Sequence, residues 1–130
     1  MKRGIAILLA LMILAATAIP CFAAVTPRYY YTESTGVELS FDGNGNALCW
    51  ATCVADTGYT SEVVCKLQRK SGSNWITVKT WTDTGGLSAW VEETWPVTSG
   101  NTYRTYAIFR IYNSSGTLVE STNDYQSGTC

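Results

Sequence analysis

The chain has 130 residues, with nine Lys and Arg, ten Asp and Glu, and no histidine. Without histidine, Ser-His and Cys-His nucleophile pairs are excluded, and catalytic zinc and general acid–base catalysis lose their most common residue. The nearly balanced charge also argues against partners that need a basic surface, namely nucleic acid and anionic lipid.

The first segment has the features of a secretory signal peptide. Lys2 and Arg3 precede an almost wholly apolar run, residues 4–19, which ends in a proline and small residues around Ala23. We predict cleavage after Ala23, which removes residues 1–23 and leaves a secreted protein, extracellular or at the cell surface. A membrane anchor is the alternative, but the run is short for a span, and its compactness is typical of bacterial signals. The mature chain keeps seven basic and ten acidic residues, a net charge of 7 − 10 = −3.

The rest of the chain predicts one all-β domain. Residues 24–36 are polar and aromatic, and we expect an irregular arm or a weak extra strand there. Residues 37–130 alternate β-branched or aromatic residues with polar ones, and Gly, Asn, Asp and Ser recur in the connections. We expect a two-sheet antiparallel sandwich of about seven strands, with a closed barrel or jelly roll as the alternative. The expected strands are residues 37–42, 47–55, 62–70, 75–82, 87–95, 102–112 and 117–122.

Alternation within these strands assigns their faces. In the fourth strand Ile76 and Val78 are assigned inward, which places Trp75 and Trp81 outward, and Trp90 is outward in the fifth. Exposed tryptophans on a sheet can form a platform for sugar rings or for a protein partner. The alternative is that the assignment is reversed in one strand, or that the arm covers the rings.

Two further assignments follow from alternation. Trp50 is assigned to the core, because the opposite face of its strand carries small residues. Glu92 and Glu93 are adjacent on one strand, so they point to opposite faces and cannot act as a catalytic pair.

Four cysteines remain after signal cleavage, an even number that predicts two disulfides in a small exported domain. Zinc is the alternative, but the chain lacks histidine and only Cys49 and Cys53 are close in sequence. Those two would lie about 13 Å apart on a regular strand, too far for a bridge. We expect Cys53–Cys65, at matching heights about the intervening loop, and Cys49–Cys130, closed by the C-terminal tail. Cys49–Cys65 with Cys53–Cys130 is the other pairing.

One loop resembles the start of a calcium-binding loop. Asp42, Asn44 and Asn46 occupy its first, third and fifth positions, but Ala47 and Cys53 stand where Gly and a bidentate Glu are required. We therefore predict a hairpin turn and no specific metal site.

Two stretches resemble known families. The run "SGNTYRTYAIFRIYNSSG", residues 99–116, resembles the F strand of fibronectin type III and immunoglobulin-like domains, with Tyr103 at the tyrosine-corner position. The run "LQRKSGSNWITVKTW", residues 67–81, resembles a hairpin in a functionally uncharacterised family of small secreted Gram-positive bacterial proteins. The resemblance implies a β-sandwich of fibronectin III or immunoglobulin type, and it implies no particular activity.

Export and fold class together predict a secreted, disulfide-stabilised, non-catalytic extracellular interaction domain. Such a domain needs no cofactor, and its partner would be an unknown protein or glycan, with no nucleic acid and no membrane bound by the mature form. One alternative is a carbohydrate-binding module that uses Trp75, Trp81 or Trp90, with at least two of these rings open and in one plane. The other is a small secreted toxin or antimicrobial protein.

Overall fold

The computed structural model describes residues 29–130, which form seven strands. The predicted signal peptide, residues 1–23, lies outside the described residues, as does the start of the predicted arm. The described part of the chain has no helix that is long and apolar enough to cross a membrane. The strands are β1 (Thr32–Phe41), β2 (Asn46–Ala55), β3 (Thr60–Ser71), β4 (Asn74–Gly85), β5 (Ser88–Pro96), β6 (Thr102–Tyr112) and β7 (Leu118–Thr129).

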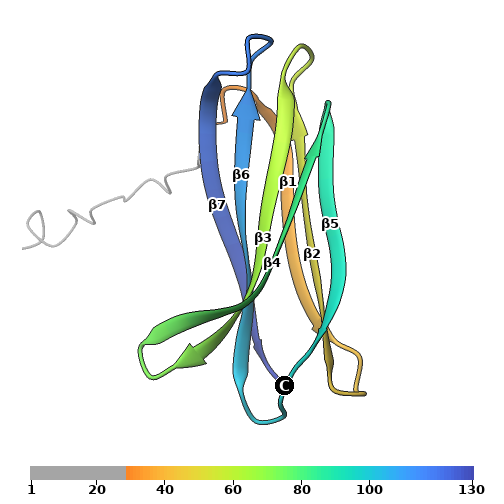
Figure 1. The fold of residues 1–130 in the computed structure, drawn as a ribbon, viewed down its shortest axis with the longest axis vertical. Coiled ribbons are helices and arrows are strands. Elements are labelled where there is room, and N and C mark those ends of the chain that lie inside the picture. The colour runs from red at the N-terminus through yellow and green to blue at the C-terminus, as the bar shows by residue number, and fades with distance from the viewer. Residues whose placement is uncertain (1–28) are drawn as a thin grey trace, which may run out of the picture.

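The strands form two antiparallel sheets that face each other (Figure 1). The smaller sheet has the order β1-β2-β5, and the larger sheet has the order β4-β3-β6-β7. This arrangement confirms the predicted sandwich of seven strands. The bounds differ most from the expected ones in two strands: β1 begins at Thr32, so the predicted arm ends in a strand, and β7 continues to Thr129.

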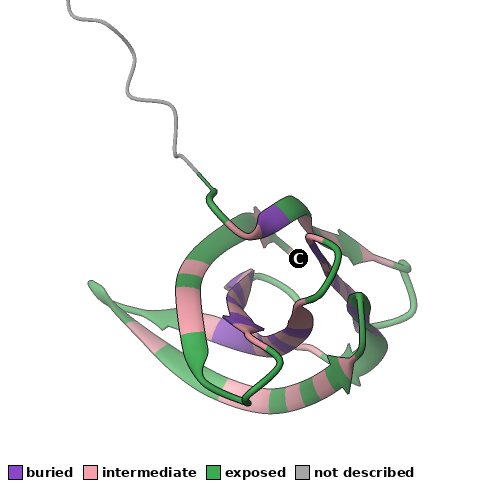
Figure 2. Ribbon diagram, turned by 90° about the horizontal axis from the view of Figure 1, so that it is seen from above, coloured by how far each residue is buried: buried purple, intermediate pink, exposed green. Residues whose placement is uncertain are grey.

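The core lies between β2 of the smaller sheet and the central strands β3 and β6 of the larger sheet. Buried residues recur along these strands in alternation with less buried ones (Figure 2). β2 contributes small side chains and the opposite sheet contributes larger ones, so the two layers fit closely. The core residues of these strands are Ala47, Cys49, Ala51, Cys53 and Ala55 on β2, Val63, Cys65 and Leu67 on β3, and Tyr103, Ala107, Phe109 and Ile111 on β6.

The prediction that Trp50 belongs to the core is wrong. The small residues of β2 face inward, so Trp50 points to the outer surface, where its indole lies over Gly36 of β1. A Cβ atom at Gly36 would lie only 2.7 Å from Cζ3 of the indole, so the missing side chain makes room for the ring. Side-chain size misled the assignment, because Phe109 and Leu67 of the opposite sheet already fill the interior.

Tyr103 takes the position that the sequence assigns to a tyrosine corner. Its hydroxyl oxygen accepts a hydrogen bond of 2.9 Å from the backbone N–H of Thr98. Its buried ring packs edge-on against Phe41, with centroids 6.4 Å apart. The hydrogen bond ties the connection between β5 and β6 to the core, as the resemblance implies.

Carboxylates connect the edges of the two sheets. On one side, Glu120 of β7 accepts hydrogen bonds from the backbone N–H of Tyr31 (3.0 Å) and from Oγ1 of Thr32 (2.9 Å) at the start of β1. On the other side, Asp83 of β4 accepts a bond of 2.9 Å from the backbone N–H of Trp90 on β5.

β4 contains a bulge that changes the direction of its side chains. Leu67 pairs with Lys79, but the next residue, Gln68, pairs with Thr77, so Val78 is an extra residue on β4. A bulge interrupts the alternation and increases the local twist of a strand. Beyond the bulge, the β3–β4 hairpin projects away from the body of the sandwich (Figures 1 and 2).

Candidate functional site

The three tryptophans predicted to form a platform lie in different places. Trp75 is on the projecting hairpin, Trp81 is farther along β4, and Trp90 is on β5. Trp75 and Trp81 are half-buried, whereas Trp90 is 61% exposed. The structure therefore gives one open ring, not a platform of three.

Trp75 is covered by cations of its own sheet. The guanidinium of Arg104 lies 4.5 Å from the centre of the Trp75 ring and also contacts the rings of Tyr106 (4.9 Å) and Tyr125 (5.0 Å). Its Nε donates a hydrogen bond of 2.7 Å to Oε1 of Gln68. Arg104 therefore lies over the Trp75 ring, with Nζ of Lys70 6.0 Å from the centre of the same ring, so we assign Trp75 to the stability of the larger sheet.

The bulge at Val78 turns Trp81 to the inner side of β4, which corrects its predicted outward orientation. Trp81 packs against the core and meets Trp95 of β5 edge-on, with ring centroids 6.3 Å apart at an angle of 76°. Lys79, also assigned outward, lies with Nζ 4.6 Å from the centre of the Trp95 ring. Alternation could not predict this arrangement, because one extra residue reverses every later position.

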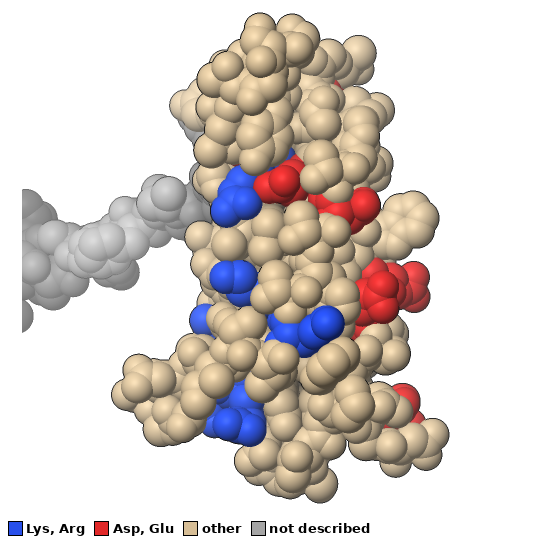
Figure 3. Space-filling model, viewed as in Figure 1, with Lys and Arg blue, Asp and Glu red and all other residues tan. Residues whose placement is uncertain are grey.

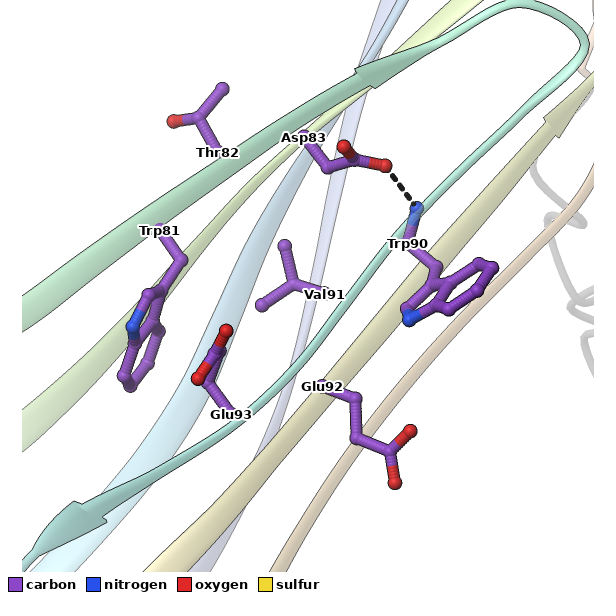
Figure 4. A pocket seen from close by; sticks show the side chains of 7 residues that line it. All are labelled: Trp81, Thr82, Asp83, Trp90, Val91, Glu92 and Glu93. Atoms are coloured by element: carbon purple, nitrogen blue, oxygen red, sulfur yellow. Dashed lines mark hydrogen bonds between the residues drawn. The ribbon is translucent and has the colours of Figure 1, made fainter.

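A groove of about 250 Å³ lies where the edges of β4 and β5 face each other. The exposed Trp90 forms part of its β5 wall, and Trp81 lies on the β4 wall. In Figure 4, Val91 and Glu93 point toward β4, whereas Trp90 and Glu92 point away from it. Adjacent positions on β5 thus point to opposite sides, as alternation predicts. The lining residues are Trp81, Thr82 and Asp83 from β4 and Trp90, Val91, Glu92 and Glu93 from β5.

The groove is acidic. Three of its seven lining residues, Asp83, Glu92 and Glu93, carry carboxylates, and none of the seven is basic. The hydrogen bond from the Trp90 backbone engages one oxygen of Asp83, which holds that carboxylate at the wall. Sequence reasoning singled out Trp90 but not Asp83 or Glu93 as site residues, because their proximity depends on which sheet edges meet.

Within residues 29–130, the basic residues are confined to one of the two sheets, whereas acidic residues occur on both. The three strands of the smaller sheet carry no Lys or Arg, and their acidic residues are Glu33 and Glu38 on β1 and Glu92 and Glu93 on β5. All basic residues of the described chain lie on the larger sheet, three on β3, one on β4 and two on β6. Figure 3 shows most basic side chains toward one side of this face and most acidic ones toward the other, with a basic and an acidic group side by side in its upper part. The groove therefore borders the smaller sheet, whose strands carry no Lys or Arg.

The cysteines carry free thiols in the structure, so the predicted bridges Cys53–Cys65 and Cys49–Cys130 are not formed in it. Burial raises the pKa of the Cys53 thiol to about 11 and that of Cys65 to about 12, and it also raises the pKa of Cys49. The proximity of Cys49 adds to the rise at Cys65. The buried thiols are thus poor nucleophiles, because little thiolate forms at neutral pH.

The positions of the cysteines along β2 and β3 argue for a different disulfide pairing. Cys49 lies six residues before the end of β2 (55 − 49) and Cys65 lies five after the start of β3 (65 − 60), so the two face each other at similar heights. Cys53 lies only two residues before the end of β2 (55 − 53). Cys130 follows the last residue of β7 and hydrogen-bonds Asn101 at the end of the sandwich where β2 begins, so it lies at the opposite end from Cys53.

The loop between β1 and β2 is the predicted hairpin turn. The Oδ1 atom of Asp42 accepts hydrogen bonds from the backbone N–H of Asn44 (2.7 Å) and Asn46 (3.1 Å), and Oδ2 accepts one from Nδ2 of Asn46 (2.9 Å). Gly43 and Gly45 have φ angles of 77° and 84°, which side chains disfavour. The Asp42 carboxylate is therefore used to shape the turn.

The residues that line the groove are suited to binding positively charged groups. Among the described residues, no three His, Cys, Asp or Glu side chains form a group that could hold a metal ion. Carboxylates beside an open indole ring attract organic cations, such as the side chains of Lys and Arg. No protein-family model matches the chain, and no curated protein matches its sequence.

Proposed function

We propose that the mature protein is a secreted, disulfide-stabilised, non-catalytic interaction domain that binds a cationic segment of an extracellular partner in the β4–β5 groove. The main support is the lining of the groove, in which three of seven residues are carboxylates and none is basic, with the exposed Trp90 ring on the outer side of β5 beside it. Carboxylates form strong hydrogen bonds with Lys and Arg, and an indole face attracts the same cations. Both kinds of group therefore favour the same ligand charge.

A basic protein segment fits the groove better than a sugar does. A carbohydrate platform needs at least two open rings in one plane, and Trp90 is the open ring among the three tryptophans of the predicted platform. Trp75 is covered by Arg104, and Trp81 packs against the core. A neutral sugar would also gain nothing from the absence of cations on the smaller sheet.

Titration of tryptophan fluorescence with a tetra-arginine peptide tests this function, with tetra-glutamate as the control ligand. We expect a saturable change with tetra-arginine alone. Binding should weaken strongly between 0.01 M and 1 M salt, because the Debye length falls from about 30 Å to about 3 Å.

Matched variants locate the binding. The double variant Glu92→Gln/Glu93→Gln should bind tetra-arginine at least about tenfold more weakly, since two charged hydrogen-bond acceptors are lost. Glu33→Gln/Glu38→Gln removes the same charge from β1 of the same sheet and should bind normally. Equal losses in both variants would contradict a specific groove. Binding of a neutral oligosaccharide without any response to tetra-arginine would favour the carbohydrate-binding function instead.

A further inference from the structure

The β3–β4 hairpin has the form and the charge of a ligand for this groove. β3 pairs with β6 as far as Arg69, and the following residues pair only with β4, so the tip of the hairpin leaves the sheet. It projects from the sandwich in both views of the fold (Figures 1 and 2). A short turn with Gly72 at a φ of 61° connects its two strands.

The projecting hairpin is basic and partly apolar. Arg69 and Lys70 lie on its β3 strand, and Lys70 is exposed. Ile76, on its β4 strand, is 43% exposed, a large value for an isoleucine on a strand. The chain has no Asp or Glu from residue 68 to residue 82, so nothing within the hairpin neutralises these cations.

We propose that the occupant of the groove is a second copy of this chain, whose projecting hairpin (residues 69–76) enters the β4–β5 groove. This inference rests on the proposed function, because it uses the same groove. Arg69 and Lys70 of one copy would meet Glu93 in the groove of the other copy and Glu92 on the outer side of its β5 wall, and the exposed Ile76 would lie in the contact. Charge complementarity between two surfaces of one chain carries the argument.

The hairpin of one molecule cannot reach the groove of the same molecule. Both lie on β4, where nine residue steps separate Asn74 at the hairpin tip from Asp83 in the groove (83 − 74). At roughly 3.3 Å per residue this is about 30 Å of strand. The contact must therefore form between molecules.

The contact would be heterologous, because the hairpin and the groove are different surfaces. Each copy that donates its hairpin keeps an open groove, and each copy that accepts one keeps a free hairpin. Such contacts build open chains, or rings where the geometry closes. We expect the assembly to grow with protein concentration and to dissociate at high salt.

Charge reversal followed by mixing tests the proposal. Arg69→Glu/Lys70→Glu gives a copy whose hairpin and groove are both acidic, and Glu92→Lys/Glu93→Lys gives a copy in which both are basic. Each variant alone should sediment as a monomer in analytical ultracentrifugation, with self-association weakened at least about tenfold. An equimolar mixture should assemble again, because each hairpin then meets a groove of opposite charge.

Controls make every outcome decisive. Glu33→Lys/Glu38→Lys changes the same charge on β1 and should assemble like the wild type. Circular dichroism checks that each variant folds, and the neutral changes Arg69→Gln/Lys70→Gln and Glu92→Gln/Glu93→Gln replace any variant that does not. A wild-type protein that stays monomeric at low salt and high concentration would overturn the proposal, as would a mixture that fails to assemble.

The same samples separate this proposal from the function on which it rests. If the wild type stays monomeric but binds tetra-arginine through Glu92 and Glu93, self-assembly is refuted and the proposed function stands. If it neither assembles nor binds tetra-arginine, both are refuted.

Discussion

Removal of Cys49 should destabilise the oxidised protein far more than removal of Cys53. Both cysteines are fully buried on the same face of β2, so replacing either by alanine removes a sulfur atom from similar surroundings. Only Cys49 faces Cys65 at a matching height across the core. We therefore expect a bridge between Cys49 and Cys65 in an oxidising compartment, which is one of the two bridges in the alternative pairing.

The length of the loop that the bridge closes sets the expected loss of stability. A Cys49–Cys65 bridge encloses 15 residues (65 − 49 − 1), and closing a loop of about 15 residues stabilises a protein by about 3 kcal/mol in the chain-entropy treatment. For a domain of this size, 3 kcal/mol corresponds to a shift in Tm of roughly 12–24 °C. Cys49→Ala should lose this stabilisation in addition to the packing cost, which Cys53→Ala shares.

The assay is thermal unfolding of both variants with and without a reducing agent, together with peptide mapping under non-reducing conditions. The difference in Tm between Cys49→Ala and Cys53→Ala should vanish when the protein is reduced. Equal Tm values in the oxidised proteins, or a mapped link between Cys53 and Cys65, would refute the reasoning.

Three further predictions concern individual side chains. Tyr103→Phe should lower the free energy of unfolding in urea by about 1 kcal/mol, because the backbone N–H of Thr98 loses its acceptor, and an unchanged value would show that water replaces the hydroxyl. Hydrogen bonds from Asn46 and the turn backbone lower the pKa of Asp42 below 3.8, so this carboxylate stabilises the fold above about pH 3.8. That stabilisation should be lost as the pH falls through the folded pKa, and an NMR titration that gives Asp42 an ordinary pKa would contradict it. In the reduced protein, burial raises the pKa of Cys65 from 9.0 to about 12, so the neutral thiol should stabilise the fold below pH 9.0. Unfolding curves should show this contribution disappearing as the pH rises from 9.0 toward 12, and curves that do not change over this range would argue against it.

The sequence predicts the elements of this fold better than their faces. β6 has the expected bounds, and its buried positions alternate with less buried ones, because an unbroken alternation of the side chains determines both. The glycine turn and the strand that follows it in the motif identify Tyr103. The alternation failed at Trp81, where Val78 forms a bulge, and at Trp50, where the opposite sheet already fills the interior. Neither cause is visible within the strand itself.

The candidate site was predictable only in part. The exposure of Trp90 follows from its strand, and the structure confirms it. Its association with Asp83 does not follow, because that contact depends on β4 and β5 being the edges that meet on one side of the sandwich. The sequence does contain one indirect signal: the strands that form the smaller sheet have acidic residues and no basic ones.

The most direct test of the groove is an NMR titration of the five tryptophan indole N–H signals with tetra-arginine. We expect the signals of Trp81 and Trp90 to shift most, because Trp81 lies on the β4 wall of the groove and Trp90 on the outer side of its β5 wall. The signal of Trp75 should stay in place, since Arg104 already covers that ring. Shifts that are largest at Trp75, or binding that leaves Trp81 and Trp90 unchanged, would contradict a cation site between β4 and β5.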